Sequence, residues 1–231
     1  MRPTPRPAPT ATSMLHEVAE GFRYCRRTPW LWLTVVVAGL ANAVVLVPSM
    51  ILIVLLLTDT LHAAHWQTGV VLAIGSVGGA VGAYASGRWR LPRRRVRAMW
   101  LAWSAGSASV GLLGLSPTTW VVAALSFVGA PLMVYGQVVW ESLLQAEVPR
   151  ALLGRVSSVD WLMSLAPSPI GAAAAGAVAG AVGVRPTLIV PATVVTGLSL
   201  ATLALVPSLT AIDRRPSAPG DAGEPLGERE G

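Results

Sequence analysis

Three uncharged polar side chains interrupt long apolar stretches of this sequence, which makes them candidates for contact with a small molecule. Asn42 lies near the middle of the apolar run 30–57, and Tyr135 and Gln137 lie at the end of the run 119–139. In apolar surroundings, amide and hydroxyl groups bond either to a neighbouring helix or to a solute. We therefore expect Asn42, Tyr135 and Gln137 to line a substrate path, and hydrogen bonds between helices are the alternative.

Two carboxylates, Glu141 and Asp160, stand where one apolar run ends and the next begins, and two arginines lie between them. Opposite charges this close in the sequence predict ion pairs of Glu141 and Asp160 with Arg150 or Arg155. Such pairs have two possible roles. They either latch the ends of neighbouring helices together, or they form a gate that breaks and reforms as the protein changes the side it faces.

A run of arginines separates two uncharged stretches. Residues 88–97 contain six arginines, whereas 66–87 and 98–115 contain no charged residue. A helix needs about 20 apolar residues to cross a hydrocarbon core about 30 Å thick, so these stretches predict a membrane hairpin. Arginine is enriched in cytoplasmic loops, which places the turn in the cytoplasm. A nucleic-acid-binding loop is the alternative, and the uncharged flanks argue against it.

The patterns that mark enzymes and metal centres are absent from this sequence. It has no glycine-rich phosphate loop, no HExxH, no cysteine cluster and no nucleophile elbow. His62 and His65 are spaced like a helical metal pair, but a solvated loop is the simpler interpretation. The single cysteine, Cys25, excludes an internal disulfide. We expect no enzymatic activity, no metal and no cofactor.

The composition is that of a polytopic membrane protein. Hydrophobic residues make up 53% of the 231 residues and charged residues 12%, against about a quarter charged in soluble domains. The predicted fold class is all-α, an integral membrane bundle of six transmembrane helices within 30–207, with an amphipathic connection at 140–159. The predicted helices are about 30–57, 66–87, 98–115, 119–139, 160–183 and 186–206.

One of these helices is predicted to pack closely against another. The stretch 66–87 carries Gly75, Gly78, Gly79 and Gly82. Small residues four positions apart share one face of a helix, and they let a second backbone approach because no side chain holds it away.

The segments outside the membrane domain are predicted to be cytoplasmic. Residues 1–14 are rich in Pro, Thr and Ala, and 208–231 in Pro and Gly, so both are expected to be disordered. Residues 15–29 can form an amphipathic helix at the cytoplasmic surface.

The distribution of arginine and tryptophan supports this topology. With both termini in the cytoplasm, 16 of the 17 arginines lie on that side and Arg185 lies outside, as the positive-inside rule requires. Eight of the nine tryptophans lie at or near predicted helix ends, where indole rings prefer the headgroup region. The predicted location is the cell membrane, with multiple crossings.

The stretch 140–171 carries a more specific pattern, which reads Val148-Pro149, Leu153-Gly154-Arg155-Val156-Ser157 and Asp160-Trp161, followed by Pro169 and Gly171. It closely resembles the region between the tenth and eleventh helices of major facilitator superfamily transporters. More narrowly, it resembles their drug and siderophore exporter branch, which includes enterobactin and macrolide efflux proteins. Residues 20–29 similarly resemble the linker that enters the seventh helix of those proteins, and the likeness covers about residues 15–210.

The resemblance implies the C-terminal half of a twelve-helix fold, in which two six-helix halves hold substrate near the midplane. Arg88 and the cluster 93–95 resemble the superfamily's loop motif between the eighth and ninth helices, although the acidic residue of that motif is absent here. The cytoplasmic gate or latch would then comprise Arg88, Arg93, Arg94, Glu141, Arg155 and Asp160.

The activity that the resemblance implies is efflux of small amphipathic molecules by alternating access. Because no counterpart of helices one to six is expected within 231 residues, the chain would act as a homodimer or with a separate N-terminal half. A truncated, non-transporting remnant and the membrane subunit of an ATP-driven exporter are the alternatives. The expected partners are the lipid bilayer and a small-molecule substrate, and not nucleic acid.

Overall fold

A computed structural model describes residues 11–88, 92, 94–206, 209 and 213, without the side chains of 11–17. Every regular element in these residues is helical, which confirms the all-α prediction. Most of the predicted disordered segments, 1–14 and 208–231, lie outside the described residues. Residues 11–14 are an exception, because they form the first turn of α1, Ala11–Arg27.

The first predicted transmembrane helix is longer than expected and is not a regular α-helix. It comprises α2 (Pro29–Ala41), the π-helical turn η1 (Asn42–Leu46), α3 (Val47–Leu55) and a second π-helical turn, η2 (Leu56–Thr60). Pro48, whose missing N–H interrupts the α-helical hydrogen bonding, is the second residue of α3 and lies two positions after the end of η1. Isolated π-turns of this kind are frequent at functional sites.

Within the described residues, five stretches are long and apolar enough to cross a membrane, where the sequence predicted six. They are Pro29–Thr60; α4, His65–Arg88; α6, Thr119–Glu147; Arg150–Val182, which contains α7 (Arg150–Leu165) and α8 (Ser168–Val182); and α9, Val184–Leu205. Most of the predicted span 98–115 lies in α5, Arg95–Leu113, which is not among these five. Several Ser and Gly residues and two arginines lower the apolar content of α5.

The predicted amphipathic connection 140–159 is helical over almost all of its length. Helix α6 continues to Glu147 and α7 begins at Arg150, so almost all of this segment belongs to two long helices. Val148 is extended, with φ −95° and ψ 131°, because a residue before proline avoids the helical region. The amphipathic pattern reflects helix ends that bury Leu143 and Val156.

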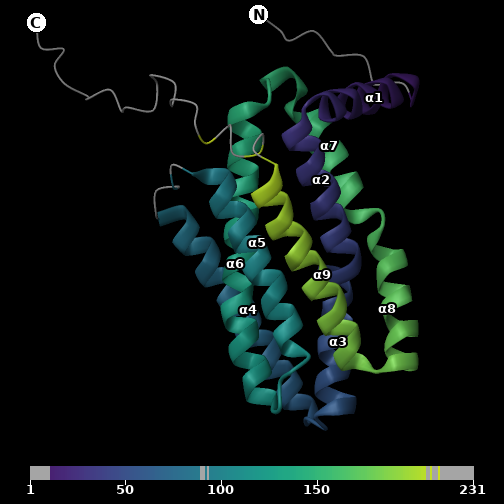
Figure 1. Ribbon diagram of the computed structural model, residues 1–231, viewed down its shortest axis with the longest axis vertical. Helices are drawn as coiled ribbons and strands as arrows, with labels where there is room; N and C mark the ends of the chain where they lie inside the picture. The colour runs from purple at the N-terminus through teal and green to yellow at the C-terminus, as the bar shows by residue number, and fades with distance from the viewer. Residues whose placement is uncertain (1–10, 89–91, 93, 207–208, 210–212, 214–231) are drawn as a thin grey trace, which may run out of the picture.

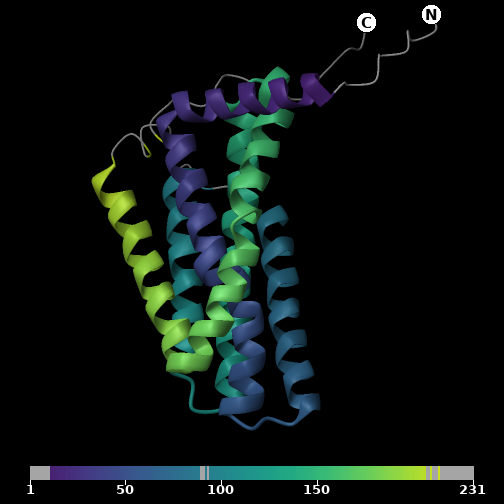
Figure 2. The ribbon, with the colours of Figure 1, turned by 90° about the vertical axis from the view of Figure 1, so that its right-hand side faces the viewer.

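The long helices run side by side along one axis, and α1 lies across one end of the bundle (Figures 1 and 2). Helix α6 ends and α7 begins at this same end, whereas η2, the start of α6 and the start of α9 lie at the opposite end. Helix α1 packs on α7 and α2, and a Cβ on Gly21 would lie 2.7 Å from the carbonyl oxygen of Arg155. This contact seats α1 against the start of α7.

Helix α6 lies between α4 and α5, and α5 in turn packs on α9. The α4–α6 contact confirms the predicted close approach. Gly78 lies against the backbone of Phe127, and a Cβ on Gly82 would lie 2.6 Å from the Cα of Pro131.

Two residues of the predicted disordered tail are attached to the bundle. Leu209 is fully buried in a core cluster that also contains Trp100 and Trp140. The carboxylate of Asp213 accepts hydrogen bonds from the backbone N–H groups of Val96, at 3.0 Å, and Arg97, at 3.3 Å. These are N–H groups of the first turn of α5, which have no partner within the helix.

Candidate functional site

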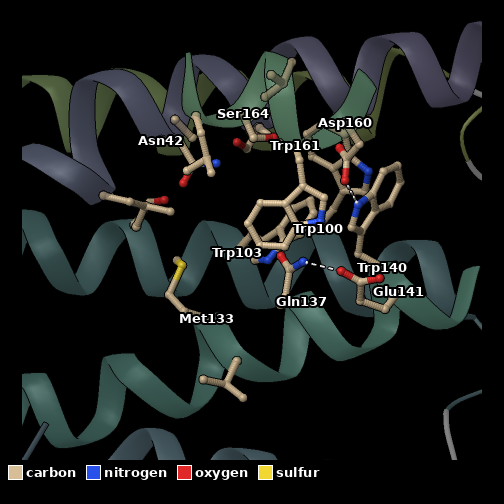
Figure 3. Close-up of a pocket in the computed structure, with 18 residues that line it drawn as sticks. Asn42, Trp100, Trp103, Met133, Gln137, Trp140, Glu141, Asp160, Trp161 and Ser164 are labelled. Atoms are coloured by element: carbon tan, nitrogen blue, oxygen red, sulfur yellow. Dashed lines mark hydrogen bonds between the residues drawn. The ribbon is translucent and has the colours of Figure 1, made fainter. Parts of the chain in front are cut away.

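A cavity of about 430 Å³ lies among α2, η1, α5, α6 and α7, with one residue of α9 on its wall (Figure 3). Most of its wall is apolar. The lining residues are Val37, Ala38, Ala41, Asn42, Leu46, Trp100, Trp103, Ser107, Met133, Val134, Gln137, Trp140, Glu141, Asp160, Trp161, Ser164, Leu165 and Ser199. The size is within the range of pockets for small organic molecules, about 300–1,000 Å³.

Four indole rings line this cavity, from three different helices. Trp100 and Trp103 come from α5, Trp140 from α6 and Trp161 from α7. Trp100 is almost fully buried and Trp161 is 55% exposed, so the indoles extend from the core to the surface. The rings of Trp103 and Trp140 are tilted against each other, with centroids 6.2 Å apart.

The position of Trp103 depends on a glycine of the neighbouring helix. A Cβ on Gly136 of α6 would overlap with the Trp103 ring, so a side chain at this position would displace the ring. A Cβ on Gly106 of α5 would likewise overlap with the end of the Met133 side chain. Two glycines thus leave room for two large side chains of the cavity wall.

Two carboxyl groups line the cavity at its α6–α7 side (Figure 3). Asp160 is 6% exposed, and its Oδ2 accepts a hydrogen bond from the indole N–H of Trp140 at 3.0 Å. Glu141 is half-buried, and its Oε1 accepts a hydrogen bond from the side-chain amide of Gln137 at 2.9 Å. No Arg or His lines the cavity among the described residues.

The predicted ion pairs of Glu141 and Asp160 with Arg150 or Arg155 are absent among the described residues. Instead, Arg155 pairs with Glu20 of α1 at 2.5 Å, and Arg150 is exposed at the start of α7. The sequence did not reveal the fold of α1 back onto α7, which gives Arg155 this partner.

The structure divides the predicted gate residues into two groups. Glu141 and Asp160 share the cavity, whereas Arg155 and the exposed Arg88 and Arg94 do not line it. The remaining member of the predicted gate, Arg93, lies outside the described residues. The gate itself stays a prediction.

Two of the three residues predicted to line a substrate path are at the cavity. Asn42 comes from the π-turn η1 and Gln137 from α6, and both appear on the wall in Figure 3. Tyr135 does not line the cavity, because it packs against the core cluster around Trp100 and Trp140.

Sequence reasoning missed the indoles. Because Trp100, Trp140 and Trp161 lie near predicted helix ends, the sequence predicts that they lie in the headgroup region. Trp103 was the one tryptophan that this interpretation did not explain, and it lies three positions, about one helical turn, after Trp100. That spacing was the available signal for an aromatic face on α5.

Cys25 and the histidines offer no alternative reactive centre. Cys25 is fully buried in α1, and burial raises the pKa of its thiol to about 11, with the charge of Asp160 adding a smaller contribution. Its thiol is therefore protonated at neutral pH. His62 and His65 belong to no group of three or more metal-ligating side chains in the described part of the chain.

The sequence matches the enterobactin exporter EntS of Escherichia coli and of Escherichia fergusonii. In each case the identity is 29% over 180 residues, which cover 75% of this chain and 40% of the relative. The chain is a homologue of an enterobactin exporter. This finding confirms the predicted resemblance to the exporter branch of the major facilitator superfamily.

The homology identifies the class of protein more closely than the fold does. No protein-family model matches the sequence, and no solved structure matches it. The matched relatives are exporters, and the five apolar stretches agree with a multi-pass membrane protein. The matched residues span 40% of the length of these relatives.

Proposed function

We propose that this chain forms one half of an exporter, which moves small amphipathic molecules out across the cell membrane by alternating access. The observation that carries the proposal is the cavity of about 430 Å³ between α2–η1 on one side and α5 and α6 on the other. Its wall combines aromatic and apolar surface with amide and carboxyl groups, as an amphipathic solute requires. The homology to an enterobactin exporter supports the direction of transport.

A second six-helix unit is part of this proposal. The chain spans 40% of the relatives it matches, and transporters of this kind hold substrate between two halves. Large apolar side chains on two helices are available for contact with such a unit or with lipid, since Tyr84 on α4 and Ile170 on α8 are 72% and 76% exposed. The unit is a second copy of this chain or a separate N-terminal half, with both termini of this chain in the cytoplasm.

Transport in everted membrane vesicles tests the proposal. Vesicles that contain the chain alone, or the chain with the N-terminal half of a relative, should accumulate an amphipathic dye such as ethidium when energised. Replacing Trp103→Ala in the cavity should lower the initial rate at least about fivefold, because an aromatic contact worth about 1 kcal/mol is lost.

Trp120→Ala provides the matched control. Trp120 is 52% exposed and does not line the cavity, so its replacement should leave the rate unchanged. If the dye does not accumulate with any partner, the exporter proposal fails and the chain is a non-transporting remnant.

A further inference from the structure

We propose that the cavity selects an organic cation, a hydrophobic ammonium or phosphonium ion, over an anion of the same size. This inference deepens the proposed function by giving the chemical class of its substrate. It rests on the side chains of the wall, which include two carboxyl groups and four indoles but, among the described residues, no basic group.

The carboxyl groups are the first support. Glu141 of α6 and Asp160 of α7 lie near each other at one end of the cavity (Figure 3). Each uses one oxygen for a hydrogen bond, and Glu141 Oε2 and Asp160 Oδ1 accept none from the described residues. Two carboxylates in a shared apolar site repel each other, so a cation between them removes a repulsion and gains two attractions.

The indoles are the second support. A cation over an indole face gains about 0.5–2 kcal/mol, more than over any other aromatic side chain. The indole of Trp140 joins both features, because its N–H binds Asp160 and its ring lies 6.2 Å from that of Trp103. An anion would meet no positive charge on the described part of the wall. The buried indole N–H of Trp100, which has no hydrogen-bond partner among the described residues, is an uncharged donor and favours neither sign of net charge.

The rest of the wall sets the shape and polarity of the ligand. Leu46, Val134 and Leu165 are apolar, and Met133 is flexible, so the bulk of the ligand is hydrophobic. A hydrated metal ion would leave this surface uncovered. The cavity therefore fits a charge enclosed by hydrocarbon or aromatic groups.

Tetraphenylphosphonium and tetraphenylborate make the decisive pair of probes, because they have nearly the same shape and opposite charge. The purified full chain in lipid nanodiscs is titrated with each ion at neutral pH, with empty nanodiscs as the reference. We expect the phosphonium to bind at least about tenfold more tightly than the borate, and to quench the tryptophan fluorescence. Equal binding, or tighter binding of the borate, overturns the proposal.

Two variants test whether the carboxylate of Glu141 is responsible for the preference for a cation. Glu141→Gln keeps the hydrogen bond to Gln137 possible and removes the charge, so it should weaken phosphonium binding about tenfold. Glu20→Gln removes a carboxylate outside the cavity and should leave binding unchanged. Thermal unfolding of each variant establishes that it is folded. Unchanged phosphonium affinity in a folded Glu141→Gln variant overturns the proposal.

Binding and transport separate the two proposals. If the phosphonium binds as expected but no dye is transported with any partner, the site stands and the exporter proposal fails. If dye is transported and the two ions bind equally, the exporter proposal stands and the charge selection fails.

Discussion

Toward α4, helix α6 is approached by glycines, whereas toward α7 it carries some of its largest side chains. On the first face, Gly78 and Gly82 bring the α4 backbone against Phe127 and Pro131. On the second face, Gln137, Trp140 and Glu141 border the cavity. One helix thus joins a tightly closed contact to an open one.

The difference shows how a membrane bundle makes room for a ligand without losing its packing. Lipid chains are as apolar as the helices, so close backbone packing holds helices together in a bilayer. The α4–α6 contact provides that packing. Helix α6 has few contacts with α7, and long side chains of both helices line the cavity instead.

The largest loss of stability is expected when a side chain fills the glycine contact between α4 and α6. Gly82→Leu should lower the free energy of unfolding by about 3 kcal/mol or more, because its side chain would enter the space of the Pro131 backbone. Thermal unfolding of the purified protein measures the change. Gly69→Leu, on the same helix with no neighbour within 4 Å, should have little effect. Similar losses in both variants would contradict a special role for the contact.

A substitution on the cavity face of α6 should change ligand affinity more than it changes the stability of the fold. Gly136→Ala forces the Trp103 ring to move, and we expect phosphonium affinity to fall about tenfold while stability falls by about 1 kcal/mol. Titration and unfolding of the same sample give both values. Gly180→Ala, which has no neighbour within 4 Å, is the control for an added methyl group. An unaltered affinity in the Gly136 variant would show that Trp103 does not shape the site.

The smallest loss of stability is expected at the ion pair between α1 and α7. Glu20→Gln removes the ion pair with Arg155, and both side chains are partly exposed, at 41% and 33%. The loss of stability should therefore be below about 1 kcal/mol and should shrink further in high salt. Unfolding curves at two salt concentrations measure it. A loss as large as that of Gly82→Leu would make this pair a latch comparable to the glycine contact.

The sequence predicted the features that depend on local pattern. The glycine spacing in 66–87 predicted the contact of α4, because periodicity alone decides which side chains share a helix face. The run 140–171 predicted the exporter resemblance, which the homology confirms. Asn42 and Gln137 were found because a polar group in an apolar run is conspicuous in any sequence.

The features that the sequence did not reveal depend on how separate segments meet. Arg155 lies five positions before Asp160, yet its partner is Glu20, which is 135 positions away. Tryptophan is suited both to the headgroup region of a membrane and to the wall of a cavity. The sequence therefore does not show which of these environments Trp140 occupies. Trp140 donates its N–H to Asp160 only because the chain reverses direction between the end of α6 and the start of α7.

The enclosed thiol of Cys25 has a practical consequence for spectroscopy. Burial raises the pKa of this thiol to about 11 and leaves it no exposed surface, so it stays protonated at neutral pH, and the thiolate is the form that alkylating reagents attack. Cysteines introduced at exposed positions such as Tyr84 and Ile170 can therefore be labelled in the otherwise unaltered chain. Pairs of spin labels or dyes at such positions would report the separation of the helices as the cavity fills and empties.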